Sequence, residues 1–378
     1  MCVSLPCLNR SKPANRRNAE RGTVLVLVLL IVALVAGLSV KFAAQYQLGL
    51  ARAETRWHGA QARAFLEGTE EVAKLMFPLG DIDDQKDFLG EPWGSEVPID
   101  DEGVSGFARM TDATAQFNLN DLARNIDPNI PEGMPERYSE PQRRFIRLLQ
   151  TFPELPLDRN QAEMLLAGVV DWIDADENES GSGGAESNFY QGMKEPYRAS
   201  NSGLFKSIDE LRLIRGFNES PMLVTLLQPY ITVLPVADAG LNINTIDLVS
   251  PYGKGMNNLL LCLNGKDDLE PMNPSELEQF IASRPPNGWD NKGAVSTAWE
   301  AMFASKQLDM DGLNVATKYF WLNSTVQLVD QRRSMRSLLM RGGADGKTLK
   351  VIRRDDVFEL PTVDRSEKDD DGDTELVE

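Results

Sequence analysis

The sequence predicts an α+β protein in which a long N-terminal transmembrane and amphipathic helix leads into an antiparallel β-sheet platform, itself interrupted by two mainly α-helical insertions. Three observations support this fold class. An uncharged apolar run covers Thr23 to Val40, a helical apolar pattern continues to Phe77, and strand patterns occur both at 103–120 and after Tyr319. The 378 residues, 42% apolar and 25% charged, are enough for two or three compact units.

A short basic segment, residues 1–22, precedes the apolar run. This segment has a net charge of +4. Because the whole chain has a net charge of −18, the remainder carries −22. Lys and Arg beside a spanning helix stay cytoplasmic, and the 18 residues from Thr23 to Val40 reach roughly 27 Å, near the hydrocarbon thickness of a bilayer. Because the small residue Gly22 lies before the run, a cut there leaves the hydrophobic helix on the mature protein.

The helical pattern continues without a proline until Pro78. Apolar residues recur near 3.6 spacing, among them Trp57, Ala64 and Val72. One helix of about 55 residues, over 23–78, is therefore predicted, and long unbroken helices of this kind pack against copies of themselves or against partners.

The rest of the chain alternates between strand and helix patterns. Phe117-Asn118-Leu119-Asn120 is echoed by Leu241-Asn242-Ile243-Asn244, each alternating apolar residues with Asn before a helical stretch. The predicted parts are a discontinuous platform (79–120, 230–250 and 316–360), a first α-helical insertion (121–229), a second (251–315) and an acidic tail (361–378).

Capping signals place the helices of the insertions. Asp158 and Ser139 each have Gln three residues later, Ser207 begins a capping box, and Asn273 precedes a proline at the first helical position. Gly216 is expected to end the helix after Ser207. Strands at about 334–341 and 347–354 are expected to complete an antiparallel meander.

Composition excludes several functions. Nucleic acid is a poor partner for so acidic a body, although 204–227 has the pattern of a helix-hairpin-helix. His58, the only histidine, lies on the long helix, so the head has no Ser-His-Asp or Cys-His site and no catalytic residue is predicted.

Cys262 is expected to be a buried thiol. The tail beyond 361 is too charged to fold, and its aspartates could chelate calcium only weakly.

The richest collection of side-chain oxygens lies between Asp171 and Asn201. Calcium takes six to eight oxygen ligands in irregular loops, whereas zinc prefers Cys or His, so calcium is the natural cofactor. The EF-hand spacing is absent, because the sixth position counted from Asp174 is Glu179 and the twelfth is Ala185. A flexible acidic surface loop, with glycines at 181, 183 and 184 for flexibility, remains the alternative.

Taken together, these features resemble a known family. A basic leader ending in Gly22, a hydrophobic helix from Thr23, an amphipathic extension and a mixed head are similar to type IV pilins and type II secretion pseudopilins. Most members carry Glu five residues after the cut, where this chain has Leu27; a carboxylate in a bilayer is costly unless paired. The minor pseudopilin K family of the general secretion pathway lacks that Glu, and the stretches at 116–122, 165–176 and 241–245 also resemble it.

The resemblance implies a pilin-like fold and a non-enzymatic role. A prepilin peptidase would cut after Gly22 and methylate Thr23, leaving an inner-membrane anchor with a periplasmic head. The protein would join other minor pseudopilins, resembling I and J, in a tip complex of the periplasmic pseudopilus that starts assembly, and its head would face secreted substrates or the outer-membrane secretin.

The resemblance also assigns the acidic loop to calcium. Asp174, Asp176 and Glu186 match the acidic positions of the family pattern, and Asn201 matches a later ligand-like position. Ser187 and Asn188 stand where the family often has Asp, which would weaken or reshape a site.

Two other functions stay open from the sequence. A minor pilin of a type IV pilus would serve adhesion or motility, so its deletion would impair attachment while secretion continues. A membrane-tethered periplasmic hydrolase would lose activity on mutation of a carboxylate pair while assembly stays normal.

Overall fold

The computed structural model describes residues 16–79, 85–101, 103–199, 203–250, 255–329, 331–343 and 346–357, with side chains from Thr23 onward. The chain divides into two compact units, Met1–Gln61 and Ala62–Glu378. The acidic tail that the sequence predicts at 361–378 lies outside the described residues.

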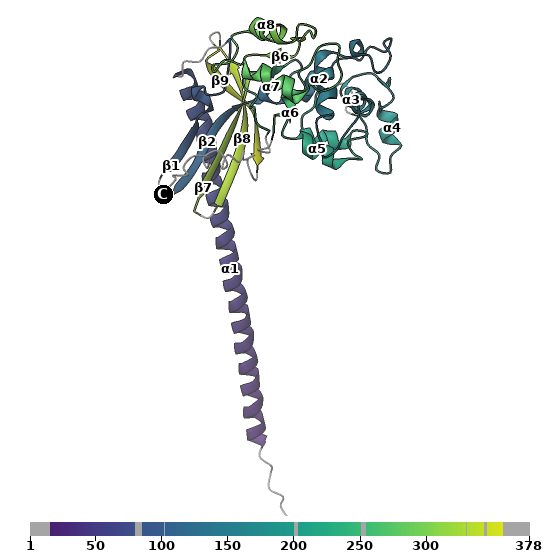
Figure 1. The fold of residues 1–378 in the computed structure, drawn as a ribbon. Coiled ribbons are helices and arrows are strands. Elements are labelled where there is room, and N and C mark those ends of the chain that lie inside the picture. The colour runs from purple at the N-terminus through teal and green to yellow at the C-terminus, as the bar shows by residue number, and fades with distance from the viewer. Residues whose placement is uncertain are drawn as a thin grey trace, which may run out of the picture. The chain divides into compact units, whose positions relative to one another are not determined.

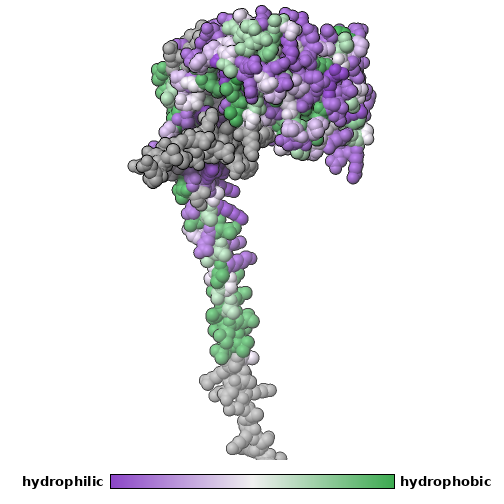
Figure 2. Space-filling model, in the orientation of Figure 1, coloured by the Kyte–Doolittle hydropathy of each residue, from purple (hydrophilic) through white to green (hydrophobic). Residues whose placement is uncertain are grey.

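The first unit contains most of helix α1, Arg16–Met76, which corresponds to the long helix predicted over 23–78 but begins earlier, at Arg16. The large apolar residues from Val24 to Val40 are all exposed, because no other part of the unit covers them. Figure 2 shows this part of α1 as a nearly continuous apolar surface. Among the described residues, one helix, Thr23–Leu79, is long and apolar enough to cross a membrane.

The second unit is built on a five-stranded antiparallel sheet (Figure 1). In spatial order its strands are β1 (Glu96–Asp101), β2 (Val104–Asp112), β7 (Tyr319–Leu328), β8 (Gln331–Gly342) and β9 (Thr348–Val357). Strands β2 and β7 are distant in sequence yet pair throughout, from Val104 opposite Leu328 to Asp112 opposite Phe320. Residues 113–318 are therefore inserted between two neighbouring strands.

The last turns of α1 pack on this sheet. Ala62 and Leu66 contact Val326 and Met335 in one apolar cluster, and Phe77 meets Phe320 edge to face with ring centroids 5.3 Å apart. These two clusters of buried side chains lie between the helix and the sheet, so this part of α1 belongs to the second unit.

The sequence placed 230–250 in the platform, and the structure differs. This segment supplies β4 (Ile231–Thr232), which pairs with β3 (Phe117–Asn118), and β5 (Leu241–Asn242), which pairs with β6 (Leu313–Asn314). These are two small parallel sheets, separate from the five-stranded sheet. Strand β2 likewise ends at Asp112, earlier than the predicted 120.

The inserted region is mainly helical, with short 3₁₀ turns between the helices. Its α-helices are α2 (Glu140–Leu149), α3 (Arg159–Ile173), α4 (Ser187–Gln191), α5 (Pro221–Leu227), α6 (Asn258–Leu261), α7 (Pro274–Ala282) and α8 (Lys292–Met302). The 3₁₀ turns of the second unit are η1 (Phe77–Leu79), η2 (Pro92–Gly94), η3 (Ala113–Ala115), η4 (Leu119–Leu122), η5 (Pro135–Arg137) and η6 (Ile208–Leu213).

The two predicted insertions share one hydrophobic core, which runs without a break from Phe117 to Val315. Cys262 is buried in this core, as predicted, and burial raises the pKa of its thiol. The capping box at Ser207 precedes the 3₁₀ turn η6 rather than the α-helix that the sequence predicts. This turn ends at Leu213, and Gly216, three residues later, has a positive φ of 84°.

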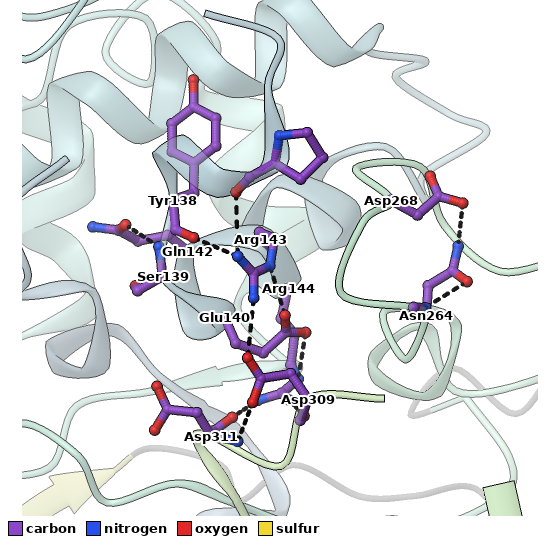
Figure 3. A network of polar contacts seen from close by, with 12 residues as sticks. Tyr138, Ser139, Glu140, Gln142, Arg143, Arg144, Asn264, Asp268, Asp309 and Asp311 are labelled. Atoms are coloured by element: carbon purple, nitrogen blue, oxygen red, sulfur yellow. Dashed lines mark hydrogen bonds and ion pairs between the residues drawn. The ribbon is translucent and has the colours of Figure 1, made fainter. Parts of the chain in front are cut away.

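Buried arginines of α2 connect the two insertions. Arg143 donates to Glu140 Oε2 at 2.6 Å and to Asp309 Oδ2 at 3.1 Å, and Arg144 donates to the Asp309 and Asp311 carbonyls at 2.7 and 2.6 Å (Figure 3). Because α2 belongs to the first insertion and Asp309 to the second, these charge-assisted bonds hold the two together.

Candidate metal centre

The acidic loop that the sequence singles out connects α3 to α4. Helix α3 begins at a capping box in which Asp158 accepts from Gln161 N at 2.9 Å and Gln161 Oε1 accepts from Asp158 N at 2.9 Å. It ends at Ile173, so Asp174 and Asp176 follow directly from its C-terminus. Glu186 immediately precedes α4 and therefore closes the same loop.

The loop brings three carboxylates together. One oxygen from each of Asp174, Asp176 and Glu186 lies within 4.8 Å of the others. Glu186 is only 4% exposed, and both of its carboxylate oxygens are buried without a hydrogen-bond donor, as is Asp174 Oδ1. No Lys or Arg forms an ion pair with these three groups within the part of the chain that the structure describes.

Hydrogen bonds from residues around the cluster position the loop. Asp171, on the last turn of α3, accepts from Ser180 N at 3.0 Å and from Ala185 N at 2.8 Å. Glu132 accepts from Ser182 N at 2.8 Å, and Arg215 donates to the Gly184 carbonyl at 2.8 Å.

Close packing explains one of the glycines of the loop. A Cβ on Gly183 would lie 2.1 Å from the Met164 carbonyl oxygen, so the loop backbone lies directly against α3. The sequence-based interpretation of the glycines as sources of flexibility is wrong at this position.

Electrostatics show that the cluster lacks positive charge. Burial, followed by the negative charges of Asp171 and Asp174, raises the pKa of Glu186 from its ordinary 4.5 to about 8. Burial and the neighbouring Asp171 and Asp176 raise the pKa of Asp174 to about 6. The C-terminal end of the α3 dipole adds further negative potential at Asp174. A bound cation would relieve all of these repulsions.

The donor set fits a hard cation. Its atoms are carboxylate oxygens, three of them orphaned in the interior, and buried polar atoms in native proteins normally have a partner. Oxygen-only ligands in an irregular loop suit calcium, whereas histidine and cysteine, which zinc prefers, are absent from the cluster.

The structure places the other predicted site residues elsewhere or does not describe them. Asn201 lies outside the described residues. Ser187 and Asn188 open α4, with Ser187 buried and Asn188 exposed. Gly22 falls within α1, and the side chain of Thr23, the next residue, is exposed.

Sequence reasoning missed the residues that support the loop. Asp171 was counted only as the start of an acidic stretch, although its place on the buried face of an amphipathic helix is a signal of a structural role. Glu132 and Arg215 carry no such signal, because they are remote in sequence.

The comparisons with known proteins agree on one family. Residues 115–236, which contain the whole acidic loop, match the family model "Type II secretion system (T2SS), protein K". Type II secretion system protein K of Aeromonas hydrophila is 30% identical over 346 residues, which cover 90% of this chain and 98% of that protein. The chain belongs to the type II secretion system protein K family. The protein K of Pseudomonas aeruginosa is also 30% identical, over 349 residues that cover 90% and 93% of the two chains.

Membership of the protein K family makes this chain a minor pseudopilin of a type II secretion system, as the sequence resemblance implied. A chain in the crystal structure of the GspK-GspI-GspJ complex from enterotoxigenic Escherichia coli matches it with a TM-score of 0.62 at 20% identity, covering 82% of this chain and all of the other. This likeness confirms the pilin-like α+β fold.

Proposed function

We propose that this protein joins two other minor pseudopilins in a complex at the tip of the periplasmic pseudopilus and helps to start its assembly, without catalysis. The observation that carries the proposal is the match to protein K, which extends over 90% of the chain and includes the inserted region as well as the sheet. The related complex named after GspK, GspI and GspJ supports partners that resemble pseudopilins I and J.

The N-terminal residues support a chain that is cut by a membrane peptidase and then held in the membrane by its apolar helix. A prepilin peptidase would cut after Gly22 and methylate Thr23, and the exposed apolar part of α1 would hold the protein in the inner membrane with its head in the periplasm. Leu27, 60% exposed, offers no carboxylate to the amine of a neighbouring subunit, which suits the first subunit of a fibre.

Calcium has a structural part in this proposal. Asp174, Asp176 and Glu186 would hold the ion, which would supply the positive charge that the loop lacks and fix α4 against α3. An ion that binds only the folded protein at 100 times its Kd adds about 2.7 kcal/mol to the free energy of unfolding. We expect calcium to raise the Tm of the protein, and a melting curve unchanged by EGTA would contradict this.

Complex formation tests the function. The full-length chain is co-expressed with pseudopilins I and J of the same organism, extracted in mild detergent and examined by size exclusion with multi-angle light scattering. We expect one stable ternary species of 1:1:1 stoichiometry. In a parallel experiment, deletion of the gene should leave secreted enzymes in the periplasm while pilus-dependent motility stays normal; the reverse pattern would indicate a type IV minor pilin.

A further inference from the structure

The second unit contains separate hydrophobic cores in its two parts. The inserted region, residues 113–318, has the core that runs from Phe117 to Val315. The clusters between α1 and the five-stranded sheet contain none of these side chains and consist of residues such as Phe77, Val326 and Met335. Because each part buries its own apolar surface, the two parts would unfold independently unless other contacts join them.

A small apolar cluster joins the two parts. In it, Leu234 of the inserted region meets Trp321 and Leu338 of the sheet. Arg336, whose guanidinium lies over the Trp321 ring, donates to Gln116 Oε1 of the inserted region at 3.5 Å. A hydrogen bond of this length is weak, so the cluster by itself gives the boundary little directional strength.

Asp87 hydrogen-bonds both parts from the segment between α1 and β1. Its carboxylate accepts from Arg341 Nη1 of β8 at 3.0 Å and from Thr317 N of the inserted region at 2.7 Å. Its own N–H donates to the Val315 carbonyl at 2.9 Å. The side chain of Asp87 is fully buried, so these bonds are shielded from water. A charge-assisted pair in such surroundings is strong and directional.

Arg341 extends this contact to the end of α1. Its guanidinium lies over the rings of Phe77 and Phe320, 5.3 and 5.1 Å from their centroids. Phe77 opens the 3₁₀ turn directly after α1, and Phe320 belongs to β7. Among the described residues, Asp87 is the one carboxylate within ion-pair distance of Arg341. One buried ion pair therefore connects the sheet, the end of α1 and the inserted region.

Asp112 supplies a second buried carboxylate at the point where β2 leads into the inserted region. Its Oδ2 accepts from Asn242 Nδ2 at 2.8 Å and from Thr245 Oγ1 at 2.6 Å, and both donors belong to the inserted region. Asn242 Nδ2 also lies 3.4 Å from the Asp87 carbonyl oxygen, so the two aspartates are neighbours. We call Asp87, Asp112 and Arg341 the polar joint.

We infer that the polar joint couples the inserted region to the sheet and to the last turns of α1, so that a calcium ion bound in the acidic loop stabilises all three. A ligand that binds only the folded state stabilises every part of the protein that unfolds together with its site. Without the joint, the ion would stabilise only the inserted region. The inference rests on the proposed function, in which Asp174, Asp176 and Glu186 hold the ion. Calcium would then regulate how firmly the head holds α1.

Hydrogen exchange of the full-length chain, measured by mass spectrometry in mild detergent, tests this coupling. Exchange is compared in calcium and in EGTA for α3, which precedes the acidic loop, and for β7 and β8 of the sheet. In the unaltered protein we expect calcium to slow the exchange of α3 and of both strands at least fivefold. In the double variant Asp87→Asn, Asp112→Asn, calcium should still slow α3 fivefold but should change the exchange of the strands less than twofold.

The double variant breaks the joint while preserving the size of both side chains. Each asparagine keeps one oxygen, so Thr114 N and Thr317 N retain an acceptor. Arg341 loses its charged partner, and Asn242 and Thr245 face an amide nitrogen in place of an oxygen.

Two further variants complete the test. Asp87→Asn alone should at least halve the effect of calcium on β7 and β8, and it decides the question if the double variant does not fold. Glu70→Gln is the matched control, because Glu70 is a fully buried carboxylate of α1 that accepts from Ser337 Oγ at 2.6 Å and from Arg354 Nη2 at 2.7 Å, both in the sheet. It should destabilise the sheet and leave the fivefold effect of calcium on the strands unchanged. Circular dichroism shows which variants are folded.

The outcomes distinguish this inference from the proposed function. Calcium that slows α3 but not the strands of the unaltered protein, or that slows the strands equally in the joint variants, would overturn the coupling alone. Loss of the effect in Glu70→Gln would also overturn it, because any weakened sheet would then behave alike. If calcium slows the exchange of no segment, the calcium part of the proposed function fails, and the inference fails with it.

Discussion

Glu186 is the most buried of the three clustered carboxylates. It is nearly inaccessible to water, its two oxygens have no donor, and Asp174 lies beside it. Ionised carboxylates in such a place repel one another strongly, and the folded protein relieves this by binding either protons or a cation.

The first prediction concerns pH in the absence of calcium. The folded-state pKa of Glu186, about 8, and that of Asp174, about 6, lie above the ordinary values of 4.5 and 3.8. The folded protein therefore binds more protons than the unfolded chain, so this site's contribution to stability is complete near pH 4 and is lost as the pH rises to 8. One pKa unit corresponds to roughly 1.4 kcal/mol, and screening by solvent reduces this value. Urea denaturation in EGTA should therefore show that the free energy of unfolding falls by about 2 kcal/mol across this window.

Calcium should reverse that trend, because bound carboxylates stay ionised. The stabilisation by calcium is therefore expected to be larger at pH 8 than at pH 5. An equal effect at both values would argue against these carboxylates as ligands.

The second prediction separates a ligand from its support. Glu186→Gln removes one negative charge, so at pH 8 it should raise the Tm in EGTA and abolish the further rise with calcium. Asp171→Asn replaces an acceptor of two loop N–H groups, so it should lower stability by about 1–3 kcal/mol with or without calcium. Differential scanning calorimetry distinguishes the two, and identical behaviour would contradict the separate roles.

At the residue scale, the sequence predicted the cluster but not its scaffold. Asp174, Asp176 and Glu186 could be selected because oxygen-rich residues accumulate in one loop and match a family pattern. Glu132, which accepts from Ser182 N, could not, because nothing local relates residues 50 positions apart.

Helix α2 is the element that connects the inserted region. Arg147 is fully buried and donates to Glu140 Oε1 at 2.8 Å and to the Cys262, Gly265 and Asp268 carbonyls at 2.7–3.0 Å. Its guanidinium therefore satisfies groups on both insertions at once.

The third prediction is a large loss of stability when this arginine is removed. Arg147→Ala removes one of the arginine partners of the buried Glu140 carboxylate, which keeps Arg143, and one donor from each of three carbonyls, which should cost about 3–5 kcal/mol. Arg212→Ala, which removes an exposed pair with Asp209, should cost less than about 1 kcal/mol. Equilibrium urea denaturation measures both, and similar values for the two variants would contradict the connecting role of α2.

The fourth prediction concerns the contact between the acidic loop and α3. Gly183→Ala would force a methyl group into the Met164 backbone, so the loop must move, and we expect a lower Tm and weaker calcium binding by isothermal titration calorimetry. Gly192→Ala is the control, since its nearest neighbour would lie at 3.4 Å and its φ of −80° suits alanine. Equal calcium affinities in the two variants would show that the loop does not need this close approach.

At the element scale, the sequence predicted correctly those boundaries that are set by hydrogen bonds between neighbouring residues. The capping box at Asp158 predicted the start of α3 because both of its hydrogen bonds lie within four residues. The strand predicted over 103–120 ends at Asp112 because its side chain accepts from Thr114 N at 2.7 Å and turns the chain. Segment 230–250 was misplaced because Asn118 Oδ1 accepts from Leu234 N at 2.9 Å, a contact between distant residues.

The molecule as a whole combines an exposed apolar helix with a head built on a five-stranded sheet, whose strands β2 and β7 lie on either side of the inserted region in the sequence. Because β2 pairs with β7, the two ends of the inserted region, residues 113–318, lie side by side in the sheet. The fold class was predictable, since its helix and strand patterns are strong, but the sharing of one core by both insertions was not, because it depends on contacts such as those of Arg147.

In the proposed function, this chain is cut after Gly22 and stays in the membrane as an anchored pseudopilin. The most direct test is intact-mass and N-terminal peptide mass spectrometry of the full-length protein extracted from membranes of cells that contain the prepilin peptidase. The proposed function predicts a chain that begins at N-methylated Thr23 and stays in the membrane fraction. A chain that still begins at Met1, or one cut beyond Val40 and released as soluble protein, would contradict it.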